Sequence, residues 1–193
     1  MSKYILQFPK EIKSLEHYIH WPDAVSHLKD RWRQNPIDEN NLVCLIMESW
    51  YAILELEYVA DNPWVPINNE LEQKMIYDIL CEAVNYGLKF HRDGILFNMY
   101  VGYAAKATPV HFVELMEEWR KTGLAMIHKA YLKDDKDLLT RVFYQESLDF
   151  CSEEFRAASR EFWTTISLSD WGDSAVQHHL FCILGGDKYH SID

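Results

Sequence analysis

The chain has 193 residues, of which 48% are hydrophobic, and its 27 aromatic residues comprise seven Trp, eleven Tyr and nine Phe. This composition excludes a disordered protein, and the length suits one domain with a sizeable core. The formal net charge of −11 at pH 7 opposes binding to nucleic acid or to an anionic membrane and favours a basic partner. No apolar run approaches the ~20 residues of a membrane span, and the N-terminal residues do not resemble a signal peptide, so we expect a cytoplasmic protein.

Helical spacing of apolar residues runs through most of the chain. Seven Gly and six Pro are few for this length, and they cluster at apparent boundaries. We therefore predict an all-α fold, with residues 1–193 forming a single domain of six to eight helices around a buried central helix. The predicted helices cover about residues 10–18, 24–33, 42–59, 71–90, 95–107, 109–132 (with a break or bend at Thr122-Gly123), 138–166 and 175–184.

The central helix is predicted over about residues 95–107, where only two residues are strongly polar. A helix that is apolar on nearly every face must be surrounded by other helices. Asp93-Gly94 is a turn signal before it, and Thr108-Pro109 is typical of the start of the next helix. Gly102 gives it a small-residue side, on which another helix can come close.

Motifs of several common enzyme classes are missing from the sequence. It contains no phosphate-binding glycine loop, no H-E-x-x-H and no C-x-x-C, and we expect neither enzymatic activity nor a cofactor nor a bound metal. The four cysteines lie far apart among apolar residues, which is typical of reduced core thiols. One alternative stays open: a metal-dependent helical enzyme that uses His17 and His20 together with Glu48 or Glu82.

Two segments together resemble a known family. Trp50-Tyr51 on one helix is followed by Phe97-x-x-Tyr100-x-Gly102-Tyr103 and then by Pro109 and Phe112. Over about residues 40–112 this pattern resembles the all-α immunity proteins of bacterial polymorphic-toxin and contact-dependent inhibition systems. The resemblance implies a small cytosolic protein that binds and neutralises one cognate toxin.

The charge distribution provides a mechanism for such binding. Residues 38–94 carry eleven Asp and Glu against three Lys and Arg, a net charge of −8. Many such toxins are nucleases with basic clefts, and an acidic helical surface can occupy such a cleft and speed association. We name the predicted partner-binding surface the acidic face; its carboxylates, with Trp64 as an apolar anchor, are Glu48, Glu55, Glu57, Asp61, Glu70, Glu72, Asp78 and Glu82. A regulatory module that binds a different basic protein would look the same in sequence, and the oligomeric state stays open.

Overall fold

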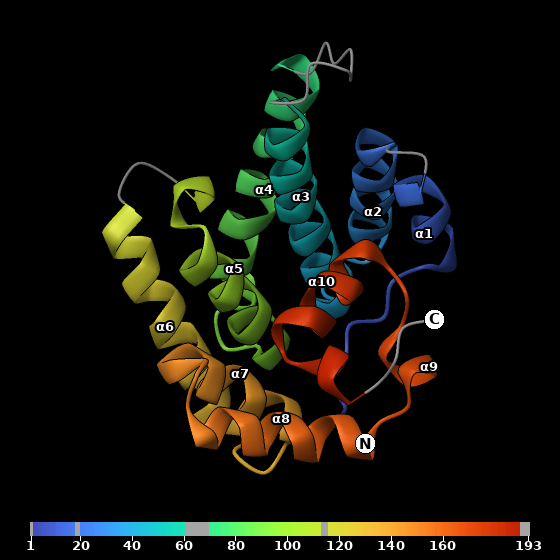
Figure 1. Ribbon diagram of the computed structural model, residues 1–193. Helices are drawn as coiled ribbons and strands as arrows, with labels where there is room; N and C mark the ends of the chain where they lie inside the picture. The colour runs from blue at the N-terminus through green and yellow to red at the C-terminus, as the bar shows by residue number, and fades with distance from the viewer. Residues whose placement is uncertain (1, 18–19, 61–69, 113–115, 190–193) are drawn as a thin grey trace.

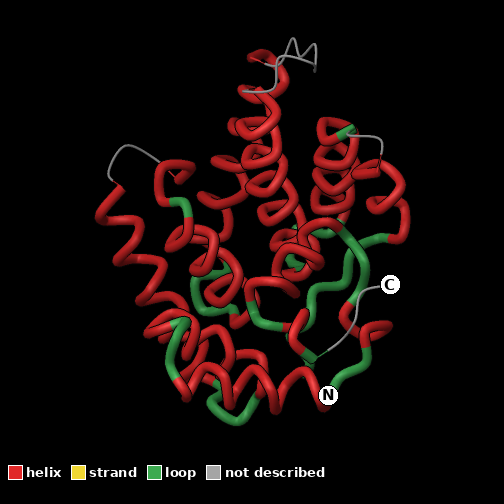
Figure 2. The backbone as a smooth tube through the Cα atoms, viewed as in Figure 1, coloured by secondary structure: helices red, strands yellow, loops and turns green. Residues whose placement is uncertain are grey.

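The computed structural model describes residues 2–17, 20–60, 70–112 and 116–189, without the side chains at 17, 58–60, 70, 116 and 117. Within these ranges every regular element is a helix and no strand occurs (Figure 2). The prediction of an all-α fold is confirmed. The α-helices, labelled in Figure 1, are α1 (Lys10–His17), α2 (Trp21–Gln34), α3 (Glu39–Ala60), α4 (Glu70–Phe90), α5 (Gly102–Ala107), α6 (Met116–Lys133), α7 (Leu138–Asp149), α8 (Glu153–Thr165), α9 (Leu168–Trp171) and α10 (Ala175–Ile183). A π-helical turn (η1, Phe97–Val101) and two 3-10 turns (η2, Pro109–Phe112; η3, Gly186–Lys188) complete them.

These ten α-helices of the described residues exceed the six to eight predicted. The prediction of a single helix over 138–166 is wrong, because the structure has two helices there: α7 ends at Asp149 and α8 begins at Glu153. Ser152 caps α8, because its Oγ accepts a hydrogen bond from the Phe155 N–H at 3.0 Å. The helices predicted over about 10–18 and 24–33 leave Pro22 outside both, which is wrong: Pro22 lies in the first turn of α2, where proline is tolerated.

The central helix is buried as predicted. Every residue from Phe97 to Ala105 is buried, first in the π-helical turn and then in α5. Glu39 of α3 supports its first turn by accepting the Phe97 N–H at 2.8 Å. Asn98, buried at the start of the π-helical turn, donates from its side chain to the carbonyls of Arg92 and Gly94. The polar groups at this helix start are thus bonded within the chain.

Gly102 makes the close helix contact that the sequence predicts. Its partner is Gly123 of α6, which is one continuous helix through this point. A Cβ on Gly102 would lie 2.8 Å from the Gly123 carbonyl oxygen, and one on Gly123 would lie 2.5 Å from the Gly102 carbonyl oxygen. Only glycine at both positions allows α5 and α6 to pack at this distance.

The helices share one core. α3 packs against both α2 and α4, α5 against α6, and α7 against α8. Buried apolar side chains from Ile5 near the N-terminus to Leu184 after α10 form a single cluster. The aromatic residues that carry the family resemblance lie inside it: the Trp50 ring meets Tyr103 edge-on at 5.9 Å, and the Trp50 indole N–H donates to Thr108 Oγ1 at 2.5 Å. These buried rings therefore position helices, whereas Tyr51 is only partly buried and packs against the edge of the core.

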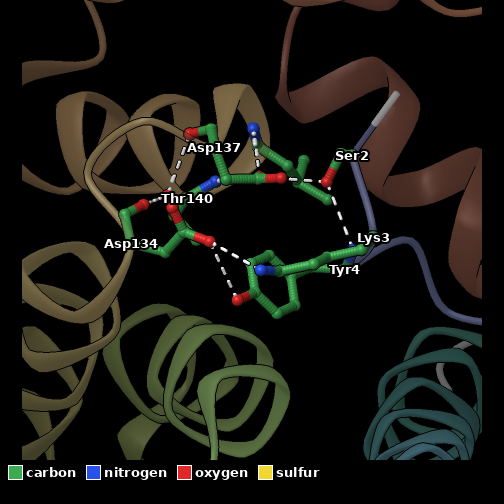
Figure 3. Close-up of polar contacts among 7 residues, drawn as sticks. Ser2, Lys3, Tyr4, Asp134, Asp137 and Thr140 are labelled. Atoms are coloured by element: carbon green, nitrogen blue, oxygen red, sulfur yellow. Dashed lines mark hydrogen bonds and ion pairs between the residues drawn. The ribbon is translucent and has the colours of Figure 1, made fainter.

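The N-terminal segment is attached to the corner between α6 and α7 (Figure 3). Ser2 Oγ donates to Asp137 Oδ1 at 2.9 Å, and the Tyr4 hydroxyl donates to Asp134 Oδ2 at 3.0 Å. Lys3 Nζ lies 3.0 Å from the same Asp134 oxygen, and the pKa of Asp134 is lowered chiefly by this contact. Residues 130 or more positions apart in the chain are thereby joined.

All four cysteines are free. Cys44 is buried and Cys81 is half-buried, in line with the prediction of core thiols. The prediction is wrong for Cys151, which follows the end of α7, and for Cys182, which lies on the outer side of α10, since both are exposed. No helix in the described ranges combines the length and the apolar character needed to cross a bilayer.

Candidate functional site

The acidic face is in part an outer surface of α3 and α4. Its exposed carboxylates in the described residues are Glu57, Glu72, Asp78 and Glu82, and Glu55 is half-buried. Asp61 and Trp64 lie outside the part of the chain that the structure describes, as does the side chain of Glu70.

The prediction that Glu48 lies on the acidic face is wrong. Its side chain is 0% exposed, and every residue from 41 to 50 is buried. This half of α3 is enclosed by other helices on all sides, so no position in it faces solvent. Glu48 cannot contact a partner in this conformation.

Several carboxylates of the acidic face have basic partners. Lys74 Nζ lies 2.8 Å from Asp78 Oδ2 on α4, and Lys29 Nζ of α2 lies 2.7 Å from Glu82 Oε2. Arg33 is a second, more distant partner of Glu82 at 3.7 Å. The local surface is therefore less negative than the residue counts indicate.

Glu57 has a histidine partner. Both of its carboxylate oxygens lie 3.1 Å from Nε2 of His111 in the turn η2. His111 is buried, and its other ring nitrogen, Nδ1, has no hydrogen-bond partner among the described residues. The contact joins the C-terminal half of α3 to the segment after the central helix.

An open groove lies between α2 and α4 and has a volume of about 730 Å³. Two of its apolar side chains are exposed: Leu71, at 80%, and Met75. Its charged lining is mixed and consists of Lys29, Asp30, Arg33, Glu72, Lys74, Asp78 and Glu82. The groove combines exposed apolar surface with charges of both signs.

A pair of carboxyl groups lies on the other side of α3. Glu16 of α1 is only 8% exposed, and its two carboxylate oxygens each accept the Ala175 N–H at 2.9 Å. Its carboxyl faces that of Glu48, while no N–H or O–H donor of any other described residue reaches either Glu48 oxygen. Burial raises the pKa of both groups, that of Glu48 well above its ordinary range, with the Glu16 charge as the next cause.

The pair must share a proton, because two ionised carboxylates in contact inside a protein repel each other strongly. The negative charge is best placed on Glu16, which receives the first N–H of α10 and lies at the positive end of that helix. The proton then belongs to Glu48, from which it can be donated to Glu16.

Glu16 also lines a pocket of about 530 Å³ between α1, α3 and α10. Trp21 and Tyr51 form an aromatic part of its wall, with their rings in edge-to-face contact at 5.7 Å. Glu55 lines the pocket, and Lys13 lies at its rim with Nζ 2.6 Å from Asp173 Oδ2. The pKa of the Tyr51 hydroxyl is raised, first by burial and then by Glu55.

The structure does not assemble the metal site of the alternative hypothesis. No group of three or more His, Cys, Asp and Glu among the described residues could hold a metal ion, although the side chain of His17 is not described. His20 is exposed at the start of α2, with Nδ1 3.8 Å from Asp23. Glu82 faces Lys29, and Glu48 faces Glu16, so neither carboxylate is available to His20 in this arrangement.

Comparisons with known proteins add no further evidence. No family model, no curated protein and no solved structure matches this chain. The protein is therefore an all-α protein with two surface features. An open groove with apolar and charged residues lies on one side of α3, and an acidic pocket with aromatic residues lies on another.

Proposed function

We propose that this protein is an immunity protein that acts in the bacterial cytoplasm. It binds one toxin, a nuclease with a basic cleft, and blocks its activity. The α4 side of the acidic face is its binding surface. The proposal combines the resemblance over residues 40–112 with the net charge of −8 in residues 38–94.

The observation that carries the proposal is the exposed surface at the start of α4. Leu71 is 80% exposed and Met75 is also exposed, next to the exposed carboxylates of Glu72 and Asp78. Large apolar side chains on a surface mark interaction sites when they are grouped and surrounded by polar residues. An apolar centre with a charged rim is the usual composition of a protein interface.

The ion pairs on this surface refine which carboxylates attract the partner. Glu82 is neutralised by Lys29 and Arg33, and Asp78 is paired with Lys74. In the described part of the chain no Lys or Arg forms an ion pair with Glu72 or Glu55. We therefore assign the long-range attraction mainly to Glu72, with Leu71 and Met75 as the apolar contact, because Glu55 lines the pocket between α1, α3 and α10 on another side of α3.

A regulatory module that binds another basic protein would use the same surface. The two functions differ in the partner, which is a toxin in one case and a harmless protein in the other. The product of the neighbouring open reading frame is the natural candidate for the toxin.

The test is co-expression of the two proteins. We expect the neighbouring product to arrest growth when expressed alone, and the present protein to restore growth and to co-purify with it. Leu71→Asp should weaken both effects. Leu132→Asp is the matched control, because Leu132 is an exposed leucine (68%) on another helix, α6. A neighbouring product that is harmless, or that does not bind, contradicts the immunity function.

A further inference from the structure

We propose that His178 and Cys182 of α10 together bind one zinc-like divalent transition metal ion, with the His178 ring and the Cys182 thiolate as its two protein ligands. The site uses no residue of the α4 surface, so it is independent of the proposed binding of a toxin. The helix that carries it, α10, is labelled in Figure 1.

The two side chains lie on the same outer face of α10. They are four positions apart, a spacing that makes side chains neighbours on one side of a helix. Both are exposed, and His178 Nε2 lies 3.9 Å from Cys182 Sγ. A thiol is a weak donor, so the hydrogen bond between the two groups is weak. Both side chains can therefore meet an ion from the solvent.

The distance between the two atoms is close to the distance that a metal ion requires. Zinc binds an imidazole nitrogen at about 2.0–2.1 Å and a thiolate sulfur at about 2.3 Å, in a tetrahedral arrangement. A tetrahedral ion thus holds the nitrogen and the sulfur about 3.6 Å apart. The observed 3.9 Å exceeds this distance by about 0.3 Å, which small side-chain rotations can remove.

Both ends of α10 are fixed by hydrogen bonds in the interior. At its start, the Ser174 hydroxyl accepts the Gln177 N–H at 3.1 Å, and the Gln177 side chain accepts the Ser174 N–H at 3.1 Å. After its end, the Leu184 carbonyl accepts the Ser159 hydroxyl at 2.7 Å and the Trp163 indole N–H at 2.8 Å. A helix held at both ends keeps its two ligands in place before the ion arrives, which lowers the cost of binding.

The residue next to His178 fixes the rotation of α10. The His179 ring packs against the rings of Trp50 and Tyr51 on α3, with centroid distances of 5.6 and 5.3 Å. Because successive residues of an α-helix point about 100° apart, this contact turns His178 toward the surface.

The ligand types select the metal. An imidazole nitrogen with a thiolate sulfur suits Zn²⁺ and Co²⁺ and does not suit Mg²⁺ or Ca²⁺, which prefer oxygen ligands. The described residues contain no group of three or more ligating side chains, so water completes the coordination. The thiol must release its proton to the solvent as the sulfur–metal bond forms. Burial, and then the charge of Asp187, raises the pKa of this thiol and adds to that cost.

Co²⁺ is the probe, because it takes the same ligands as Zn²⁺ and absorbs light when a thiolate binds it. It is titrated into the full-length protein with all four cysteines kept reduced by a phosphine. We expect a saturable charge-transfer band in the near ultraviolet, with a Kd of about 0.1 mM or tighter. At a free Co²⁺ concentration about 100-fold above the Kd, the Tm should rise by about 5 °C or more.

Three variants locate the site. Cys182→Ser should abolish the band, and His178→Gln should weaken binding about tenfold or more, since even the loss of an outer partner of a metal ligand costs about tenfold. Both residues are exposed, so both variants should fold as the wild type does. Cys151→Ser is the matched control, because Cys151 is also exposed but has no histidine within four positions, and this variant should bind Co²⁺ unchanged.

Mg²⁺ is the control ion and should leave the Tm unchanged. Four results would each overturn the proposal: no charge-transfer band with the wild type, a band that persists in Cys182→Ser, unchanged affinity in His178→Gln, or an equal rise of Tm with Mg²⁺.

Discussion

The carboxyl of Glu48 faces the carboxyl of Glu16 in the interior between α1 and α3, with exposed fractions of 0% and 8%. The backbone N–H of Ala175 stabilises the charge on Glu16, but only Glu16 itself can accept a hydrogen bond from a protonated Glu48. Such an arrangement is stable only while one proton remains on the pair. The stability of the packing between α1, α3 and α10 therefore depends on the protonation of this pair, and so on pH.

Glu48→Gln is expected to remove a pH dependence of stability. The pKa of Glu48 is raised in the folded protein, so the folded state binds more protons than the unfolded state above the ordinary pKa of about 4.3. The free energy of unfolding of the wild type therefore falls as pH rises from there through the folded pKa, and each unit of raised pKa costs about 1.4 kcal/mol at high pH. Glutamine has nearly the same shape and no proton to lose.

The measurement is the Tm of both proteins from pH 5 to pH 8. The variant should match the wild type at pH 5 and exceed it at pH 8. The charged and titratable groups around the pair are the same in both proteins, so the difference between the two profiles reports on the pair; these groups are Lys13, Tyr51, Glu55, Asp173, His178 and His179. Parallel Tm profiles would show that Glu48 does not titrate in this range.

The sequence is sufficient to predict the buried central helix and its contact with a second helix. A helix over 95–107 is apolar on all faces, so it must be buried among other helices. Gly102 costs stability in a helix unless it allows another helix to pack closely, which it does here. These features depend on local pattern, which is why they can be found without a structure.

The burial of Glu16 and Glu48 was missed, although a signal exists. Glu16 follows Ile12 by four residues and so lies on the buried face of α1. Glu48 follows the apolar run of residues 42–47 in the half of α3 that other helices enclose. We placed it on a solvent face because carboxylates are seldom buried, but only the packing of α1 against α3 shows that a second carboxyl shares its proton.

The break between α7 and α8 was missed for a different reason. Leu148 and Phe150 continue the helical spacing of apolar residues through the corner, yet both side chains are exposed. An exposed apolar residue is indistinguishable from a core residue in a periodic pattern. The cap at Ser152 was the available signal.

Gly123→Ala is expected to destabilise the protein by about 2 kcal/mol, because the new methyl group would meet backbone atoms of α5 that cannot move aside easily. Helix propensity alone would favour alanine by up to about 1 kcal/mol. Thr122→Ala is the matched control: the neighbouring Thr122 is exposed, and its replacement should stabilise slightly. Urea denaturation measures both. Equal effects of the two substitutions would show that α5 and α6 do not pack closely at Gly123.

Lys106→Met is expected to cost about 3 kcal/mol, because it leaves the buried Glu146 carboxylate without its partner. Lys106 Nζ lies 2.6 Å from both Glu146 oxygens and joins α5 to α7. The double variant with Glu146→Leu should recover much of the loss, since an apolar pair leaves no charge buried. A double-mutant cycle in urea gives the coupling energy, expected at about 1–3 kcal/mol. Additive effects of the two substitutions would mean that the Lys106–Glu146 interaction contributes no coupling energy to the stability of the protein.

Asp137→Ala is expected to destabilise the protein by about 1–2 kcal/mol, through loss of the cap of α7. Its carboxylate accepts the N–H groups of Leu139 and Thr140 and also the Ser2 hydroxyl. Asp135→Ala, at an exposed carboxylate in the same corner, should stay within about 0.5 kcal/mol of the wild type. Tm measurements at one pH distinguish the two. Equal losses would indicate a general charge effect in place of the specific hydrogen bonds.

Reversal of two charges on α4, Glu72→Lys with Asp78→Lys, is expected to slow association with the proposed toxin partner far more than it speeds dissociation. Exposed charges act at long range on the encounter rate, whereas buried contacts govern the dissociation rate. The salt dependence of the association rate should weaken as well. Glu153→Lys with Glu154→Lys on α8 changes the net charge by the same amount away from α4, as Figure 1 shows, and should have a much smaller effect. Stopped-flow association at several salt concentrations makes the comparison. Equal slowing by the two double variants would show that net charge attracts the toxin and that the α4 surface has no special role.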